Sequence, residues 1–523
     1  MADYRGLFIV MHCQKRHEKA DIAGGWFLWY TILWSTDWCT KLLQIPHYPC
    51  VLSKILGFLW LRIVKNVYFC GMIFKRKIYA KLLEWKQSAK GTKALLVEGA
   101  RRIGKSTIVE QFAMTEYKSY ILIDFNDVSA TVLNAFENYL NDLDAFFVIL
   151  SAEYGVTLHR RESVIIFDEV QRYPKARQSI KKLVKDGRYD YIETGSLISI
   201  REAVKGITIP SEERSVKMYP MDFEEFAMAF GDESLVAYIR QCFAERKPLE
   251  RNLHNKALFR FKQYMLVGGM PQSVSAFLEN DCNFALADQE KRDILALYRN
   301  DIMRIDAQYR SKVLAIFDQI PAFLSRHEKR VVLSDIAKGS YFDQYTDTFF
   351  WLGDSMMVNE CFNTTDPNVG LSLNEDRTLI KCYMGDTGLL VSHAFSENEI
   401  ADEQLYKQIL NNKLSLNQGM LYENVIAQML VANGHKLFFY THYSEEKHRN
   451  DIEIDFLISN MSKIKYKIYP IEVKSSAHYS TASLDNFVPK FRERVDWAYI
   501  IHPRNLTVSE KRIPIPPYMA ICL

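Results

Sequence analysis

The chain has 523 residues, of which 48% are hydrophobic and 25% are charged, and its formal net charge is +3. This is the composition of a globular protein with room for about three domains, so a largely disordered chain is excluded. The near-neutral charge excludes recognition of a polyanion by overall charge, so any nucleic-acid surface would have to be a local patch. The nine cysteines include no CxxC pair, which favours the reducing cytoplasm over a disulfide framework or a zinc knuckle.

Residues 1–71 differ in composition from the rest of the chain. They hold five of the eight tryptophans and show no clear helical or strand period. Their apolar run at 22–34 is about 13 residues long, whereas roughly 20 are needed to span a bilayer. We therefore expect no membrane protein and interpret residues 1–71 as an atypical extension upstream of a native start at Met72. A membrane hairpin is the alternative interpretation.

The segment "ALLVEGARRIGKST" at 94–107 contains the phosphate-binding pattern GxxxxGK[ST] between an apolar strand and an amphipathic helix. Its glycines let successive amide N–H groups point at a phosphate chain, and the following helix adds the positive end of its dipole. We expect Lys105 to bridge the β and γ phosphates of ATP and Ser106 to bind Mg²⁺. The predicted nucleotide-binding residues are Gly99, Ala100, Arg101, Arg102, Ile103, Gly104, Lys105, Ser106 and Thr107.

The segment "SVIIFDEVQ" predicts a second buried strand, which ends in Asp168 and Glu169. The carboxyl ends of parallel strands form the ligand-binding edge of an open α/β sheet. We expect Asp168 to hold Mg²⁺ through water and Glu169 to orient or deprotonate the attacking water. A small-molecule kinase is disfavoured by this pair of acids and by the long segments that follow.

A third strand, "YDYIETGS", ends beside these acids. Its Thr194 is predicted to sense the γ-phosphate, with Ser196 as the alternative, and an ordinary strand-to-loop turn is the simpler interpretation.

These motifs, together with "ERSVKMYPMDFEEF" at 213–226 and "YMLVGGMPQSV" at 264–274, resemble a family of prokaryotic AAA+ ATP-binding proteins that carry a C-terminal domain of unknown function. The resemblance covers nearly everything from Met72 onward. It aligns Arg214 with a family arginine that would contact the γ-phosphate, but the glycine before it is replaced by Glu213. We therefore favour a plain surface arginine at this position, with Arg172 and Arg201 as rivals for that role.

The resemblance and the helical spacing together predict the fold class as α/β with several modules. We expect an AAA+ P-loop core at 72–225, a helical lid at 226–305, a winged-helix module at 306–376 and a restriction-endonuclease-like domain at 377–523. The expected recognition helix, "FDQYTDTFFWLGD", carries Asp343, Asp347 and Asp354 and no Arg or Lys. Acids facing phosphates oppose binding, so protein contact is favoured over reading of the DNA major groove.

The C-terminal part contains a set of charged residues on neighbouring strands. In "NDIEIDFLIS" the apolar residues alternate with Glu453 and Asp455, and "YPIEVKSS" supplies Glu472 and Lys474. With Glu423 from the preceding helix, this is the pattern of the restriction-endonuclease-like fold. We predict that Glu423, Asp455 and Glu472 bind Mg²⁺, and that Lys474 stabilises the attacked phosphate. A plain salt bridge between Glu472 and Lys474 is the alternative.

The stretch "LIKCYMGDTGLLV" at 379–391 is interpreted as a turn into a helix, and we assign it no chemistry. Overall, the sequence predicts a cytoplasmic ATPase that couples hydrolysis to a nuclease-like domain acting on or holding DNA or RNA. The alternative is an ATP-dependent switch whose inactive nuclease-like domain binds a protein partner. Self-association is a further candidate interaction.

Overall fold

The computed structural model describes residues 72–196, 211–368, 370–397, 403–411, 417–446, 448–462, 465–476, 478–509 and 511–523. The chain divides into two units, Met1–Met72 and Ile73–Leu523. The predictions made for residues 1–71 and for Arg201 lie outside the described residues. Within the described ranges, no helix combines the length and the apolar character that a membrane crossing requires.

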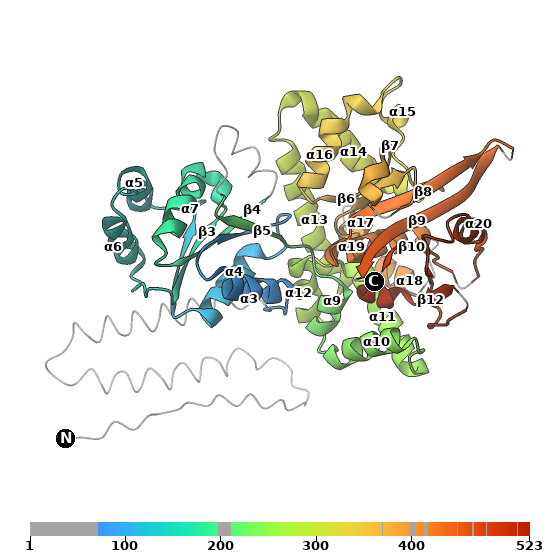
Figure 1. Ribbon diagram of the computed structural model, residues 1–523, viewed down its shortest axis with the longest axis horizontal. Coiled ribbons are helices and arrows are strands. Elements are labelled where there is room, and N and C mark those ends of the chain that lie inside the picture. The colour runs from blue at the N-terminus through green and yellow to red at the C-terminus, as the bar shows by residue number, and fades with distance from the viewer. Residues whose placement is uncertain are drawn as a thin grey trace. The chain divides into compact units, whose positions relative to one another are not determined.

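A five-stranded parallel sheet forms the first part of the second unit (Figure 1). The strand order is β2-β3-β4-β1-β5. The strands are β1 Ala94–Glu98, β2 Ser119–Asp124, β3 Ser163–Asp168, β4 Asp190–Gly195 and β5 Glu213–Lys217. The helices around it are α3 Ile78–Ala89, α4 Lys105–Glu116, α5 Ala130–Asn138, α6 Leu143–Tyr154 and α7 Pro174–Asp186.

The two faces of this sheet are buried against different helices. Leu95 and Ile166 pack in one apolar cluster with residues of α3 and α4, whereas Leu96 and Phe167 pack in a second with residues of α5, α6 and α7. Covering on both faces explains why the central strands are continuous apolar runs rather than alternating ones. The predicted α/β architecture with a parallel sheet is thereby confirmed.

Residues 223–325 are mostly helical, and they include the segment predicted as a lid. The helices are α9 Phe223–Ala229, α10 Glu233–Glu245, α11 Arg251–Val267, α12 Pro271–Glu279, α13 Phe284–Ile302 and α14 Ala307–Ser325. Their apolar faces join the same large cluster as one face of the parallel sheet, so their positions depend on packing with it.

The second sheet has seven strands in the order β12-β11-β10-β9-β8-β6-β7. These are β6 Val358–Thr364, β7 Glu375–Met384, β8 Leu437–Ser444, β9 Arg449–Ser462, β10 Lys465–Val473, β11 Ala498–Ile501 and β12 Arg512–Ile515. The helices nearby are α15 Leu333–Ile336, α16 Thr346–Asp354, α17 Thr387–Ala394, α18 Glu403–Leu410, α19 Gln418–Ala432 and α20 Ala482–Lys490. In α19 every residue from Met420 to Leu430 is buried, as expected for a helix that is enclosed on all sides.

The separate winged-helix module predicted for 306–376 needs correction. Its helices α14 and α16 pack together, and β6 and β7 pair antiparallel as a wing would. However, β6 also pairs in parallel with β8, which makes the hairpin part of the C-terminal sheet. The predicted boundary at 376/377 therefore falls inside β7.

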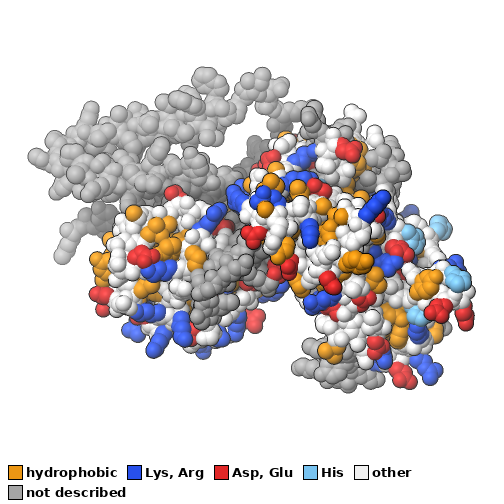
Figure 2. All heavy atoms as spheres, turned by 90° about the horizontal axis from the view of Figure 1, so that it is seen from above, with side chains coloured by type: hydrophobic (Ala, Val, Ile, Leu, Met, Phe, Trp, Pro, Cys, Tyr) orange, Lys and Arg blue, Asp and Glu red, His pale blue; other side chains and the backbone are white. Residues whose placement is uncertain are grey.

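Surface charge agrees with the near-neutral composition. On the face shown in Figure 2, basic and acidic side chains of the described residues are interspersed. A polyanion partner would therefore need a local site on this face rather than an extended basic surface.

Candidate functional site

The loop between β1 and α4 has the geometry of a phosphate cradle. Gly104 adopts a left-handed conformation with φ of 88°, and α4 begins at Lys105 directly after it. At Gly99 a Cβ atom would lie 2.6 Å from the carbonyl oxygen of Met218, so only glycine fits. The two glycines of the motif thus serve a tight turn and a close backbone approach at the start of a helix.

Lys105 lies buried within this loop. Its Nζ donates hydrogen bonds to the carbonyl oxygens of Gly99, at 3.0 Å, and Ala100, at 2.8 Å. Burial lowers the pKa of Lys105 to about 8, although the nearby Glu169 and Asp168 act in the opposite direction. An anionic ligand in the loop would compensate for the lost hydration of this ammonium.

The predicted acids and hydroxyls meet at the end of the sheet. Ser106 Oγ donates to Asp168 Oδ1 at 2.9 Å, across 62 positions of sequence. Thr194 also donates to Asp168 Oδ1, and β4, which carries Thr194, lies between β1 and β3. Burial raises the pKa of Asp168, while these two hydrogen bonds lower it. A hydroxyl beside a carboxylate at a phosphate loop fits a Mg²⁺ ion bound with ATP.

Glu169 follows Asp168 with a left-handed backbone, φ 53°, which is uncommon for a residue with a side chain. Its amide N–H donates to Thr194 Oγ1 at 3.4 Å, and its carboxylate accepts a hydrogen bond from Gln171 Nε2 at 2.5 Å. Gln171 orients this carboxylate and was not singled out from the sequence. In the sequence, only its position two residues after Glu169 could have indicated this role.

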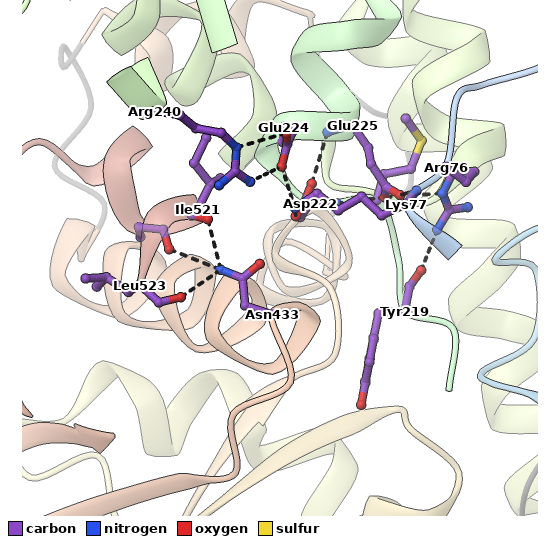
Figure 3. Close-up of polar contacts among 12 residues, drawn as sticks. Arg76, Lys77, Tyr219, Asp222, Glu224, Glu225, Arg240, Asn433, Ile521 and Leu523 are labelled. Atoms are coloured by element: carbon purple, nitrogen blue, oxygen red, sulfur yellow. Dashed lines mark hydrogen bonds and ion pairs between the residues drawn. The ribbon is translucent and has the colours of Figure 1, made fainter. Parts of the chain in front are cut away.

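Arg76 contacts the phosphate loop and was not singled out from the sequence either. Its guanidinium donates to the carbonyl oxygen of Ile103 at 2.8 Å. It also donates to the carbonyl oxygen of Tyr219 at 2.6 Å and pairs with Glu225 at 3.2 Å (Figure 3). These contacts join the segment before α3, the loop and the start of α9. No short-range sequence pattern connects positions this far apart.

Figure 3 also shows the neighbouring ion-pair network. Lys77 pairs with Asp222 and, at 2.6 Å, with Glu224, which in turn pairs with Arg240 at 2.5 Å. Asn433, after α19, donates to the carbonyl oxygens of Ile521 and Leu523. These contacts join α9 and α10 to the residue that precedes α3, and the end of α19 to the last residues of the chain.

The candidate arginines Arg214 and Arg172 are both exposed. Arg214, on β5, donates to Ser88 Oγ of α3 at 3.2 Å. This placement agrees with the interpretation of Arg214 as a surface arginine.

The glycine pair of "LVGGMP" docks on two other segments. A Cβ atom at Gly269 would lie 1.9 Å from the carbonyl oxygen of Met221, and one at Gly268 would lie 2.2 Å from Asp386 Oδ1. The amide N–H of Gly269 donates to Asp386 Oδ2 at 2.5 Å. Asp386 also caps α17 by accepting from the amide N–H of Leu389. This buried carboxylate therefore joins the helical segment to the C-terminal part.

A second connection runs from the phosphate loop through α13. Arg101 pairs with Asp301 at 2.7 Å, near the C-terminal end of α13. In the same helix, Asp288 accepts a hydrogen bond from Ser392 of α17. Helix α17 is in turn fixed to α19 by Gln428, whose Oε1 accepts from the amide N–H of Thr387 at 2.8 Å. The helix that presents Glu423 is thus linked to the loop.

The four predicted residues of the C-terminal set come together. Glu423 Oε2 accepts from the hydroxyl of Tyr383 at 3.1 Å, and Asp455 Oδ2 accepts from the amide N–H of Val473 at 2.8 Å. Lys474 Nζ lies 3.0 Å from Glu472 Oε2. Burial is the main cause that raises the pKa of Glu472 to about 7, with Asp455 adding to it against Lys474.

Two lysines that lie beside these residues were not singled out from the sequence. Lys329 Nζ lies 2.5 Å from Glu423 Oε1. Lys381 is buried and lies 3.7 Å from Glu453 Oε1, and its Nζ makes no hydrogen bond. We name the set Glu423, Glu453, Asp455, Glu472, Lys329, Lys381 and Lys474 the C-terminal charge cluster.

The C-terminal charge cluster does not fit a divalent cation in this arrangement. Among the described residues, no group of three or more His, Cys, Asp or Glu side chains is placed to hold a metal ion. Lysines pair with Glu423 and Glu472, two of the three carboxylates predicted to bind metal. The metal-binding role of Glu423, Asp455 and Glu472 therefore stays a prediction.

Three parts of the chain match known families. Residues 91–227 match an AAA domain, residues 258–399 match a domain of unknown function (DUF8612), and residues 418–518 match another (DUF4143). The chain therefore contains an AAA-type P-loop domain followed by two domains without an assigned function. No curated protein matches the chain.

Several solved structures are similar to the chain at low identity. The Walker-type ATPase PABY2304 of Pyrococcus abyssi is 15% identical, with 61% of this chain and 96% of that chain covered and a TM-score of 0.35. The Orc1 protein of Aeropyrum pernix in complex with DNA is 9% identical, with 64% and 95% covered and a TM-score of 0.26. The RuvB Holliday junction branch migration motor of Thermotoga maritima is 11% identical, with 55% and 89% covered and a TM-score of 0.25.

Proposed function

We propose that this protein binds Mg-ATP at the loop after β1, hydrolyses it, and transmits its nucleotide state to the C-terminal charge cluster. The observation that carries the proposal is the hydrogen bond of 2.9 Å between Ser106 Oγ and Asp168 Oδ1. It brings the hydroxyl of the phosphate loop and the acid of a different strand to one point. A hydroxyl and a carboxylate held together beside a phosphate loop are the ligand types that Mg²⁺ uses when it is bound with ATP.

Each residue then has a role that follows from its position. Lys105 would turn from the loop carbonyls to the β and γ phosphates, and Ser106 with Asp168 would hold Mg²⁺. When bound, Mg²⁺ neutralises charge on the phosphate oxygens. Glu169, held by Gln171, would accept a proton from the attacking water. Thr194 touches Asp168 and would report the presence of the γ-phosphate through that contact.

Coupling between the two ends is supported by contiguous contacts. Arg101 lies in the phosphate loop and pairs with Asp301 of α13. From α13 the contacts continue through α17 to α19, which carries Glu423. A ligand that moves Arg101 would therefore act on a packed set of helices rather than on a mobile linker.

Two hypotheses remain for the C-terminal charge cluster. In the first, it acts on or holds DNA or RNA. Lys474 and the carboxylates of Glu472 and the other acids would then perform the chemistry of phosphodiester cleavage. In the second, the protein is an ATP-dependent switch and the cluster is a non-catalytic scaffold that binds a protein partner. The pairing of lysines with Glu423 and Glu472 favours the second hypothesis for the arrangement described here.

A cleavage assay separates the two hypotheses. Plasmid and single-stranded DNA and RNA are incubated with the purified chain and Mg²⁺ or Mn²⁺, with and without ATP. The variant Glu472→Gln removes one carboxylate, and Glu493→Gln, at an exposed position, is the matched control. Cleavage by wild type and by the control, but not by Glu472→Gln, supports the nuclease. Equal behaviour of all three proteins supports the switch.

A further inference from the structure

A cavity of about 330 Å³ lies beside β6 and is lined by segments that are distant in sequence. Its lining includes Glu360 of β6, Met356 after α16, and Leu437 at the start of β8. Lys217, the last residue of β5, also contributes. This volume is in the range of sites that hold small molecules.

Glu360 brings a carboxyl group without a hydrogen-bonded oxygen partner to this cavity. Its Oε1 is buried and makes no hydrogen bond with any described residue. A buried carboxyl oxygen in this state costs free energy, which a ligand with a hydrogen-bond donor would recover. A Cβ atom at Gly353 of α16 would lie 2.5 Å from Glu360 Oε2. Glycine at this position of the helix therefore leaves the room that the carboxyl group occupies.

The charges around Glu360 favour a cation. Burial raises the pKa of Glu360 to about 7, and the nearby Asp354 and Glu375 raise it further. Lys436 and Arg377 lower it, but both of them pair with Glu375, at 2.5 Å and 2.8 Å. Their charges are thus shared with another acid, and an ammonium group at Glu360 would stabilise its ionised form.

The exposed side of the cavity carries the opposite charge. Lys217 and Lys436 line it and are exposed, whereas Val358 and Leu437 line it and are buried. The cavity therefore combines an acid, an apolar wall and lysines at its exposed side. A ligand that satisfies all three has a cationic end, an apolar middle and an anionic end.

We propose that this cavity binds a small zwitterionic molecule with an amino group at one end and an anionic group at the other. The carboxylate of Glu360 holds the amino group, Val358 and Leu437 contact the chain between the two ends, and Lys217 meets the anionic group. The lining shares no residue with the phosphate loop or with the C-terminal charge cluster. The site is thus a further one, and it does not depend on the proposed function.

Binding of small probes to the full chain, without nucleotide, tests the proposal. The probes are the ω-amino acids from β-alanine to ε-aminocaproate, with n-hexylamine and caproate as molecules that lack one charged end. Calorimetry and saturation-transfer NMR measure the affinity. The proteins are wild type, Glu360→Gln, Lys217→Met and, as the matched control at an exposed position, Glu446→Gln.

We expect saturable binding of at least one ω-amino acid to the wild-type chain. Glu360→Gln should bind it about tenfold or more weakly, because the charge-assisted hydrogen bonds to the amino group are lost. Glu446→Gln should behave as wild type. Lys217→Met should weaken binding of the ω-amino acid but leave that of n-hexylamine unchanged.

Three results would overturn the proposal. The first is the absence of saturable binding across the whole series of ω-amino acids. The second is equal binding by wild type and Glu360→Gln. The third is an affinity for caproate that equals the affinity for the best ω-amino acid.

The pH dependence of binding to the wild-type chain covers the case in which Glu360→Gln fails to fold. Below a pKa of about 7, Glu360 is mostly protonated and must release its proton to hold an ammonium group. Affinity should therefore fall with falling pH below pH 7, by up to about tenfold per pH unit, with release of protons on binding. His435 also lines the cavity, so His435→Gln is measured as well and should keep this dependence. An affinity that is independent of pH, or a dependence that His435→Gln abolishes, contradicts the role of Glu360.

Discussion

At the scale of single residues, the account depends on side chains that would be costly without a ligand. Lys105 is buried with hydrogen bonds to two loop carbonyls, and Glu169 has a left-handed backbone conformation. Both features cost stability, and such costs persist where a site is prepared for its ligand.

The role of Glu169 gives the first prediction. Glu169→Gln keeps the shape of the side chain and its neighbour Gln171 but removes the proton acceptor. We expect ATP affinity to remain and turnover to fall by about 100-fold or more. Phosphate release in steady state measures this, with Glu162→Gln, an exposed residue before β3, as the matched control. Turnover that survives in Glu169→Gln would remove this residue from the reaction.

The pH dependence of ATP binding gives the second prediction. Burial lowers the pKa of Lys105 to about 8 in the nucleotide-free chain. A triphosphate beside the ammonium favours its charged form, so the pKa is higher in the complex. Above pH 8 binding must take up a proton, and ATP affinity should fall with rising pH, by up to about tenfold per pH unit. Titration calorimetry in buffers of different ionisation enthalpy detects both effects, and affinity that rises with pH would contradict the assignment.

At the scale of elements, the sequence predicted the features that short segments encode. The glycine loop between a strand and a helix is a local pattern, and so are the acids at the end of an apolar strand. Parallel strands present their carboxyl ends at one edge of the sheet, and this rule places Lys105, Asp168 and Thr194 side by side. The structure brings these residues together. Alternation along "NDIEIDFLIS" likewise placed the apolar residues inside, and Glu453 and Asp455 are partly exposed as expected.

Contacts between distant segments could not be predicted in this way. Arg76 reaches Ile103 and Tyr219, and Lys329 reaches Glu423, without any periodic signal around them. The pairing of β6 with β8 could not be predicted either, because the sequence of a hairpin does not show whether its outer edge is free or paired. This is why the predicted winged-helix module was separated from the sheet that contains its strands.

The docking of the glycine pair gives the third prediction, at the level of packing between elements. Gly269→Ala would place a Cβ atom 1.9 Å from a backbone oxygen of Met221, which cannot move without shifting the chain. We expect destabilisation of about 3 kcal/mol or more. Gly419→Ala is the control, since its Cβ would meet only the side chain of Asn417, at 3.3 Å, inside α19. That variant should be neutral or more stable by up to about 1 kcal/mol. Chemical denaturation measures both, and equal stability of the two variants would contradict the tight docking.

At the scale of the whole molecule, the contacts through α13, α17 and α19 make the phosphate loop and the C-terminal charge cluster parts of one packed structure. A coupling of about 1–3 kcal/mol is typical of such linkage. Its direction is reciprocal, so a ligand at the cluster should also change the affinity for ATP.

Hydrogen exchange gives the fourth prediction. Addition of Mg-ATP should change amide exchange in α17 and α19 of the wild-type chain. In Asp301→Asn, which breaks the ion pair with Arg101, ATP should still bind but the change in α19 should shrink. Asp293→Asn, at an exposed position of the same helix, should respond as wild type. An undiminished response in Asp301→Asn would show that this ion pair carries no coupling.

The central claim is that the loop from Gly99 to Thr107 binds Mg-ATP through Lys105. Titration calorimetry of Mg-ATP into wild type, Lys105→Met and Lys93→Met tests it most directly, because Lys93 is an exposed lysine next to the same strand. We predict saturable binding by wild type and by Lys93→Met, and its loss in Lys105→Met. Absence of binding to the wild-type chain, or equal binding by Lys105→Met, would contradict the claim.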